Sequence, residues 1–331
     1  MPEFRQDPIT GRWVIIAPAR AARPGPAGSS PERANGEPCP FCAGNEAMTP
    51  PEVWAQREPG TKADRPGWRL RIVPNKYPAL TSGGEPPRKS DGFYRSVNAL
   101  GIHEVIIESP DHVTHMGAVG AAQLIGILRG YRERLRVLRK DPRWRCLLIY
   151  KNQGERAGAT LEHIHSQLTA LTTVPREAMD EINGSSKHFA ATGRCIYCEI
   201  CRRETDGGER LVAENDRFVA LCPFAPRFGY ESWLLPKHHA ADLADSADDD
   251  IAALGQILRE LILKLTRLSD DLPFNYVIRS LPRDDARPDA HWHMKVLPQL
   301  ARAAGFEWGT GVHMNSIPPE EAARLLRGTP L

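Results

Sequence analysis

The chain carries one set of potential metal ligands twice, and this repetition constrains its fold more than any other feature. The repeated side chains are Cys39, Cys42, His112 and His163 in the first half, and Cys195, Cys198, His239 and His291 in the second. The paired histidines are 51 residues apart in the first set and 52 apart in the second. A long amphipathic helix pattern and an apolar strand pattern separate them in both halves. This agreement predicts a duplicated module.

The elements expected within each half define an α+β protein. Helical periodicity runs through 119–139 and again through 251–268, with apolar residues three and four positions apart. Strand-like runs occur at 103–108, 144–150, 218–222, 233–235 and 274–279. We therefore predict two modules in tandem, each a mostly antiparallel sheet with flanking helices. The boundary falls within 174–193, which gives domains of 1–175 and 176–331.

Each repeated set offers two thiolates and two imidazoles, the combination that suits tetrahedral Zn²⁺. Neither set leaves an obvious position for a catalytic water, so the expected zinc ions are structural, and iron could occupy one of the sites. His103, His115 and His238 are alternative ligands, and Cys201 could replace Cys198. A redox role for either C-x-x-C pair is less favoured, because both pairs have matched histidines.

The segment from Gly158 to Leu168 adds reactive chemistry to the first half. Within it His163, His165 and Gln167 alternate with apolar or small residues, so a strand would place them on one face. A glycine-containing turn before them can bring backbone N–H groups to a phosphate. An imidazole nucleophile beside an amide donor suggests nucleotidyl transfer, and the alternative is a half-buried strand that happens to carry two histidines.

The second half lacks this combination. Lys295 lies at the spacing of Gln167, and the loop 281–290 contains no glycine. We therefore assign catalysis to the first half and a supporting role to the second.

Composition excludes several other classes of protein. The 43 basic and 41 acidic side chains nearly balance, so nothing favours a nucleic acid polymer as partner. No apolar run is long enough to span a membrane, and the first residues contain no apolar leader segment. These features predict a cytoplasmic protein that does not bind membranes.

Motifs along nearly the whole chain resemble the galactose-1-phosphate uridylyltransferase family, the nucleotidyl-transferase branch of the histidine-triad superfamily. The matching segments are 20–24 (RAARP), 39–42 (CPFC), 73–76 (VPNK), 109–112 (SPDH), 152–154 (NQG), 158–168 (GATLEHIHSQL), 291–293 (HWH) and 305–311 (GFEWGTG). A glutamine at position 167 is similar to the transferases of the superfamily, because the hydrolases carry a histidine there.

The resemblance implies two histidine-triad-like domains and an enzyme of galactose metabolism that acts as a homodimer. His165 would attack UDP-glucose and carry the uridylyl group to galactose 1-phosphate, giving UDP-galactose and glucose 1-phosphate, while Gln167 donates to a phosphoryl oxygen. The expected partners are thus a nucleotide sugar and a hexose 1-phosphate. The implied substrate-binding residues are Arg20, Arg23, Asn75, Asn152, Gly158, Ala159, Thr160, Gln167, Gly305, Phe306, Glu307, Gly309 and Thr310.

Two alternatives stay open. Ile164 replaces the proline usual between the two histidines, and a related ADP-glucose phosphorylase branch shares the two metal sites and the closing glycine-rich strip. That branch would move an adenylyl group to phosphate. A zinc-stabilised module that binds a nucleotide sugar without chemistry is the second alternative. Uridylyl transfer is the interpretation that we prefer.

Overall fold

The computed structural model describes residues 2–6, 13–16, 38–83, 89–90, 92–269, 272–280 and 287–331. Its centre is a ten-stranded sheet in which all neighbouring strands are antiparallel. In sheet order the strands are β3 (Trp54–Arg57), β4 (Trp68–Pro74), β7 (Gly101–Ile107), β9 (His165–Leu171), β8 (Cys146–Gln153), β13 (Phe274–Ser280), β14 (Met294–Pro298), β12 (Ser232–Pro236), β11 (Phe218–Leu221) and β10 (Leu211–Glu214).

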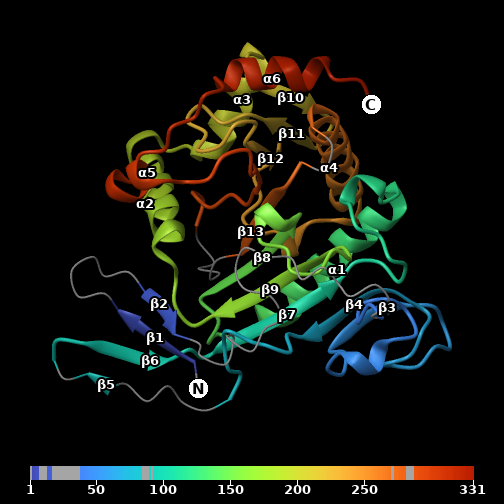
Figure 1. The fold of residues 1–331 in the computed structure, drawn as a ribbon. Helices are drawn as coiled ribbons and strands as arrows, with labels where there is room; N and C mark the ends of the chain where they lie inside the picture. Colours follow the sequence, from blue (N-terminus) through green and yellow to red (C-terminus); the bar gives the residue numbers. More distant parts are fainter. Residues whose placement is uncertain are drawn as a thin grey trace.

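The duplication is visible in this strand order. From the seam outward, the first half contributes β8, β9, β7, β4 and β3, and the second contributes β13, β14, β12, β11 and β10. The halves meet where β8 and β13 pair in register, from Gln153 opposite Phe274 to Leu147 opposite Ser280. The expected α+β class with mostly antiparallel strands is confirmed, and the two sheets join into one (Figure 1). This pairing removes the two exposed strand edges that separate five-stranded sheets would have there.

Helices α1 (Ala121–Leu138) and α4 (Asp248–Leu268) occupy corresponding places in the two halves. They pack against each other, and their apolar sides share one hydrophobic core with strands of both halves. Both lie within three residues of the ranges that periodicity predicts. The other helices are α2 (Arg176–Thr192), α3 (Ile196–Gly207), α5 (Gly305–Thr310) and α6 (Pro319–Gly328), with single-turn 3₁₀ helices at Glu46–Met48, Met116–Ala118, Glu155–Ala157 and Leu243–Asp245.

Side-chain alternation on β9 separates the core from the candidate site. Ser166 and Leu168 point toward α1 and the main core, so His165 and Gln167 point to the opposite face. On that opposite face, smaller apolar clusters lie beside the two C-x-x-C segments, one containing Cys39 and Phe41 and the other containing Cys201. The sheet therefore has a helix-covered face and a ligand-bearing face.

A second sheet of four strands lies beside the first half, in the order β2 (Trp13–Ile16), β1 (Glu3–Gln6), β6 (Arg95–Asn98) and β5 (Lys89–Ser90) (Figure 1). Ser316, which precedes two prolines and two glutamates, is the N-cap that the sequence predicts for the closing helix. That prediction is wrong, because α6 begins at Pro319 with Pro318 at the N-cap. Proline fixes φ near the helical value, which favours this later start. Among the described residues, no helix is both long and apolar enough to cross a membrane.

Candidate functional site

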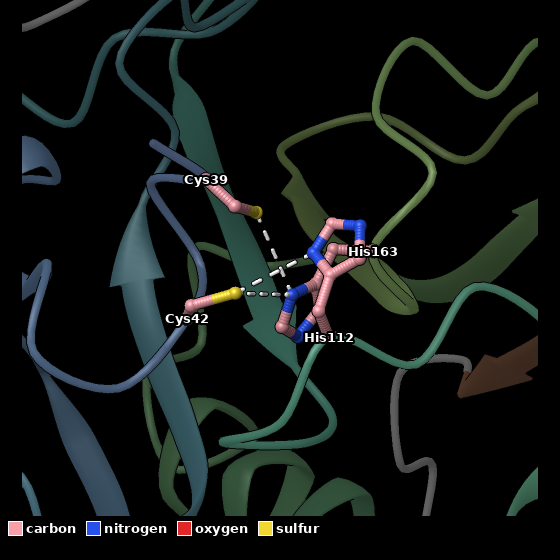
Figure 2. Close-up of side chains that lie close together, drawn as sticks. All are labelled: Cys39, Cys42, His112 and His163. Atoms are coloured by element: carbon pink, nitrogen blue, oxygen red, sulfur yellow. Dashed lines mark hydrogen bonds between the residues drawn. The ribbon is translucent and has the colours of Figure 1, made fainter. Parts of the chain in front are cut away.

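Both predicted ligand sets come together on the ligand-bearing face. In each set one nitrogen or sulfur per residue lies within 4.8 Å of the others. Three Sγ–Nδ1 pairs of the first set lie 3.4 to 3.6 Å apart, and three of the second lie 3.5 to 3.8 Å apart. Figure 2 shows the side chains of the first set. Tetrahedral zinc with ordinary bond lengths separates sulfur and nitrogen ligands by about 3.6 Å. The donor atoms of both clusters therefore fit a zinc-sized ion.

A backbone carbonyl orients one histidine of each cluster. Nε2 of His163 donates to the Ser109 carbonyl at 2.9 Å, and Nε2 of His291 donates to the Pro236 carbonyl at 3.1 Å. Each carbonyl lies three residues before the other histidine ligand of its cluster. Because Nε2 carries the proton, Nδ1 is left with the lone pair that a metal requires. The two halves thus repeat the ligands and also the groups that orient them.

The competing ligands have other partners. His103 bonds to Gln167, the His115 ring accepts from the Gly117 N–H, and His238 lies 4.0 Å from Asp250. The Cys201 thiol contacts the Pro236 carbonyl. None of these four belongs to either cluster of the described residues.

The expectation that His163, His165 and Gln167 share one strand face is wrong for His163. Strand β9 begins at His165, and His163 precedes it in an irregular segment that Ile164 anchors. The Ile164 N–H donates to the Val113 carbonyl at 2.8 Å, and its own carbonyl accepts from the Glu108 N–H at 3.3 Å. This anchoring lets His163 turn toward the cysteines while His165 stays in the sheet.

His165 has the tautomer that a nucleophile needs. Its Nδ1 donates to the His163 carbonyl at 2.8 Å, so Nε2 bears the lone pair. The ring is buried beside Phe41, with ring centroids 5.2 Å apart. Burial lowers the pKa of His165 to about 4, and the imidazole is therefore neutral at pH 7.

Gln167, two residues further along the same face, is held by its carbonyl end. Its Oε1 accepts from His103 Nε2 at 2.8 Å and from the Tyr150 hydroxyl at 2.9 Å. Its Nε2 makes no hydrogen bond to any residue that the structure describes. The amide nitrogen is thus the end of the side chain that can bind a ligand beside His165. Sequence reasoning missed Tyr150, although alternation on 144–150 places it on the same face of the sheet.

The predicted phosphate turn is stabilised from both halves. Asn152 Nδ2 donates to the Gly158 carbonyl at 3.3 Å, and Asn275 of β13 donates to the Ala157 carbonyl and to Asn152 Oδ1, both at 2.8 Å. The N–H groups of Gly158 and Ala159 bond within the turn, to Glu155 and Gly154. Asn152 therefore shapes the turn, and Asn275 is a contribution of the second half that sequence reasoning missed.

A buried polar network lies behind the candidate nucleophile on the helix-covered face. Lys151 Nζ forms an ion pair with Glu108 and donates to the His165 carbonyl at 3.2 Å. Ser166 and Tyr131 donate to Glu108, and the Tyr276 hydroxyl of the second half lies 2.5 Å from that of Tyr131. Burial alone would raise the pKa of Glu108, but the Lys151 ammonium and these donors hold it below its usual value. The network fixes the backbone of β9 where it carries His165.

The other implied substrate residues differ in their position relative to His165 and Gln167. Asn75 lies beside His103, the residue that bonds to Gln167, with Asn75 Nδ2 3.2 Å from His103 Nε2. The strip from Gly305 to Thr310 forms helix α5 in the second half, where Phe306 is 48% exposed. No hydrogen bond or ring contact joins the described residues of α5 to His165 or Gln167. Arg20 and Arg23 lie outside the described residues, and the role of Thr160 stays a prediction.

The corresponding position of the second half is filled by its own side chains. His293 lies between the rings of Tyr197 and Trp233, with centroids 4.8 and 5.3 Å away. Lys295, at the position of Gln167, forms an ion pair with Glu181 of α2. Arg279 lies 2.8 Å from the same carboxylate. Among the residues that the structure describes, His293 and Lys295 are therefore both engaged by side chains of the second half.

Comparisons with known proteins agree with this arrangement. The sequence profile described as galactose-1-phosphate uridyl transferase, N-terminal domain, matches residues 1–175, and a profile for a domain of unknown function, DUF4921, matches 133–327. ADP-glucose phosphorylase from Arabidopsis thaliana is 35% identical, over 98% of this chain and 92% of the relative. Galactose-1-phosphate uridylyltransferase from Thermotoga maritima is 29% identical, over 99% of both chains.

Solved structures extend the agreement to the fold. The crystal structure of ADP-glucose phosphorylase from Arabidopsis thaliana with bound ADP-glucose matches with a TM-score of 0.77 and 32% identity, covering 100% of both chains. The family profile covers more than half of the chain, and the relatives align over nearly all of it. The chain belongs to the galactose-1-phosphate uridylyltransferase family, close to its ADP-glucose phosphorylase subgroup.

Proposed function

We propose that this chain is a galactose-1-phosphate uridylyltransferase, which moves a uridylyl group from UDP-glucose to galactose 1-phosphate through a covalent intermediate on His165. The observation that carries the proposal is the hydrogen bond from His165 Nδ1 to the His163 carbonyl, at 2.8 Å. This hydrogen bond keeps the proton on Nδ1, so the lone pair is on Nε2. His165 is two residues from Gln167 on the same face of β9. The family relatives named as uridylyltransferases support the same activity.

In the first half-reaction, the lone pair of His165 Nε2 forms a bond to the α-phosphorus of UDP-glucose. The bond from that phosphorus to the bridging oxygen breaks, and glucose 1-phosphate leaves with the oxygen and the electron pair. No proton moves, because Nε2 carries none and Nδ1 keeps its own. A phosphate oxygen of galactose 1-phosphate then attacks the same phosphorus, and the P–N electrons return to the imidazole. Covalent catalysis divides one difficult displacement into two easier ones.

The surrounding groups stabilise this chemistry. The Gln167 amide donates to a non-bridging oxygen as charge builds up on the phosphorus. Arg20, Arg23, Asn75 and the 154–160 turn bind phosphate or nucleotide groups in the proposal, and the Gly305–Thr310 strip recognises the hexose phosphate. Lys151 holds the backbone of His165 in place.

The two clusters hold zinc in this proposal, because thiolate and imidazole donors at these separations suit that ion. Zinc would supply structure, joining Cys39 and Cys42 to the segment that ends at His163. The proposal further divides the chain into domains 1–175 and 176–331 and places it in the cytoplasm as a homodimer.

The test is to incubate the protein with UDP-glucose labelled at the α-phosphate. We expect acid-labile, base-stable label on the protein, release of glucose 1-phosphate, and transfer of the label to galactose 1-phosphate. Tight binding of the nucleotide sugar without any labelling would instead identify a binding module and contradict the proposal.

Adenylyl transfer from ADP-glucose to phosphate is the second candidate. The observation in its favour is the identity to the Arabidopsis thaliana ADP-glucose phosphorylase, 35% against 29% for the Thermotoga maritima uridylyltransferase. Parallel reactions with labelled ADP-glucose, and with phosphate or galactose 1-phosphate as acceptor, separate the two candidates. Faster labelling by UDP-glucose with galactose 1-phosphate as acceptor supports the first, and the reverse pattern supports the second.

A further inference from the structure

Within the part of the chain that the structure describes, the side chain of Gln167 is hydrogen-bonded at one end only. Its Oε1 accepts two hydrogen bonds, from His103 at 2.8 Å and from Tyr150 at 2.9 Å. Tyr150 lies directly opposite Gln167 on β8, and His103 approaches diagonally from β7 on the other side. The amide oxygen is therefore hydrogen-bonded from both neighbouring strands.

The backbone fixes the protonation of His103. Its Nδ1 accepts from the Ala79 N–H at 3.1 Å, so its proton is on Nε2, where it can only donate. His103 Nε2 lies 2.8 Å from the Gln167 oxygen, 3.2 Å from the Asn75 amide nitrogen and 3.3 Å from the Tyr150 hydroxyl. The Asn75 nitrogen cannot accept a proton, because its Oδ1 accepts from the Tyr77 N–H and its NH₂ faces His103. The Gln167 oxygen is the acceptor at the shorter distance. If the Gln167 amide were reversed, its NH₂ group would face the N–H of His103, and two donors would oppose each other.

This polarity decides what Gln167 offers a phosphoryl group. An unrestrained carboxamide can rotate by half a turn and present its oxygen, which repels a phosphoryl oxygen. With Oε1 held, only Nε2 can face the substrate, two residues from His165. We propose that His103 and Tyr150 are positioning residues, which lock the Gln167 amide so that its N–H groups meet the phosphoryl oxygen. This inference rests on the proposed nucleotidyl transfer and adds to it two residues that touch no substrate.

The test measures the rate of protein labelling by α-phosphate-labelled UDP-glucose after rapid mixing. His103→Ala is expected to slow labelling by about 10- to 100-fold, up to the loss seen when an oxyanion donor is removed. Tyr150→Phe, which deletes one oxygen and preserves the fold, should slow it by a smaller factor. The KM for UDP-glucose and the metal content should not change. His103→Gln, which restores an N–H donor at a similar reach, should recover part of the rate.

A double-mutant cycle separates positioning from general structural damage. In a Gln167→Ala background, both substitutions should alter the labelling rate by less than about 2-fold, because nothing remains to be positioned. His188→Ala and Tyr94→Phe are matched controls away from β9 and should label at the wild-type rate.

Three outcomes overturn the inference. One is a His103→Ala effect of full size in the Gln167→Ala background, and another is wild-type labelling rates in both single variants. A wild-type protein that takes no label from UDP-glucose or ADP-glucose overturns the proposed function and the inference with it. The first two outcomes leave the proposed function intact.

Discussion

The two H-x-H segments, 163–165 and 291–293, occupy corresponding places beside corresponding Cys/His clusters, yet the second histidine of each segment has different surroundings. His165 donates from Nδ1 to a carbonyl at 2.8 Å and lies two residues from Gln167, whose amide nitrogen bonds to none of the described residues. His293 lies 3.5 Å from the corresponding carbonyl and is enclosed by Tyr197 and Trp233. Lys295, where Gln167 would be, is tied to Glu181.

The comparison distinguishes features that both halves share from features that belong to the candidate reactive site. Both halves have the two cysteines and two histidines, the orienting carbonyl and the five-stranded order, so these features belong to the repeated fold. Among the described residues, those of the first half form the glycine turn, the amide beside His165 and the buried network behind the strand. The second half contributes to that site from outside, through Asn275 at the turn and Tyr276 in the network.

The largest expected effect distinguishes the two central histidines. His165→Ala should reduce turnover by about 10⁴-fold or more, because it removes the group that forms the covalent bond. His293→Ala, the matched change in the second half, should leave turnover within a few-fold of wild type. Steady-state assays with UDP-glucose and galactose 1-phosphate measure both. Equal losses in the two variants would contradict the division of roles.

The next effect compares the metal clusters. Cys42→Ser and Cys198→Ser should each lower the bound zinc by one ion per chain, measured by elemental analysis. Cys42→Ser should also reduce activity by roughly 10- to 100-fold, because the first cluster fixes the segment leading into His165. Cys198→Ser should lower thermal stability with a much smaller change in activity. Full zinc content in both variants would show that these thiols are not ligands.

A smaller effect concerns the ion pairs that fill the second half. Burial alone would raise the pKa of Glu181, but Lys295 and Arg279 hold it down to about 2. A carboxyl whose pKa is depressed on folding adds stability above its unfolded pKa, near 4.5, and loses it as the pH falls toward 2. Glu181→Gln should therefore cost on the order of 2 kcal/mol at pH 7.

Urea unfolding of Glu181→Gln and wild type, measured between pH 7 and pH 3, tests this expectation. The stability difference between the two proteins should shrink as the pH falls below about 4.5, because Glu181 of the unfolded wild-type chain then takes up a proton while the folded carboxyl stays ionised. A difference that is independent of pH would rule out the ion pairs as its cause.

The smallest effect tests the link between the halves. Tyr276→Phe removes the hydroxyl that the second half places beside Tyr131, and should lower the free energy of unfolding by about 1 kcal/mol. Denaturant unfolding measures this change, and Tyr94→Phe, at an exposed tyrosine, is the control. Equal stability of Tyr276→Phe and wild type would show that the hydroxyl adds nothing to the network.

Much of this comparison can be predicted from the sequence, because it depends on local periods and repeated spacings. The helical period located α1 and α4, and the alternation of His165 and Gln167 placed both on one strand face. The ligand spacings identified both clusters. The ion pair that engages Lys295 in the second half could not be predicted, because its partner Glu181 is 114 positions away in the chain.

The seam between the halves and the network behind His165 also escaped prediction. Apolar strand patterns show which residues are buried but not which strand edges meet, so the pairing of β8 with β13 left no mark in the sequence. A lysine inside a strand pattern does not identify its partner, and Glu108 lies 43 positions before Lys151. Such contacts depend on the assembled sheet.

The most direct test of the division between the halves is to map the covalent adduct. The protein is treated with UDP-glucose, and in parallel with ADP-glucose, digested at neutral or alkaline pH, and its peptides are analysed by mass spectrometry. The account predicts one nucleotidyl group per chain, on the peptide that contains His165, and an unmodified peptide around His293. An adduct on His293, or no adduct from either nucleotide sugar, would contradict it.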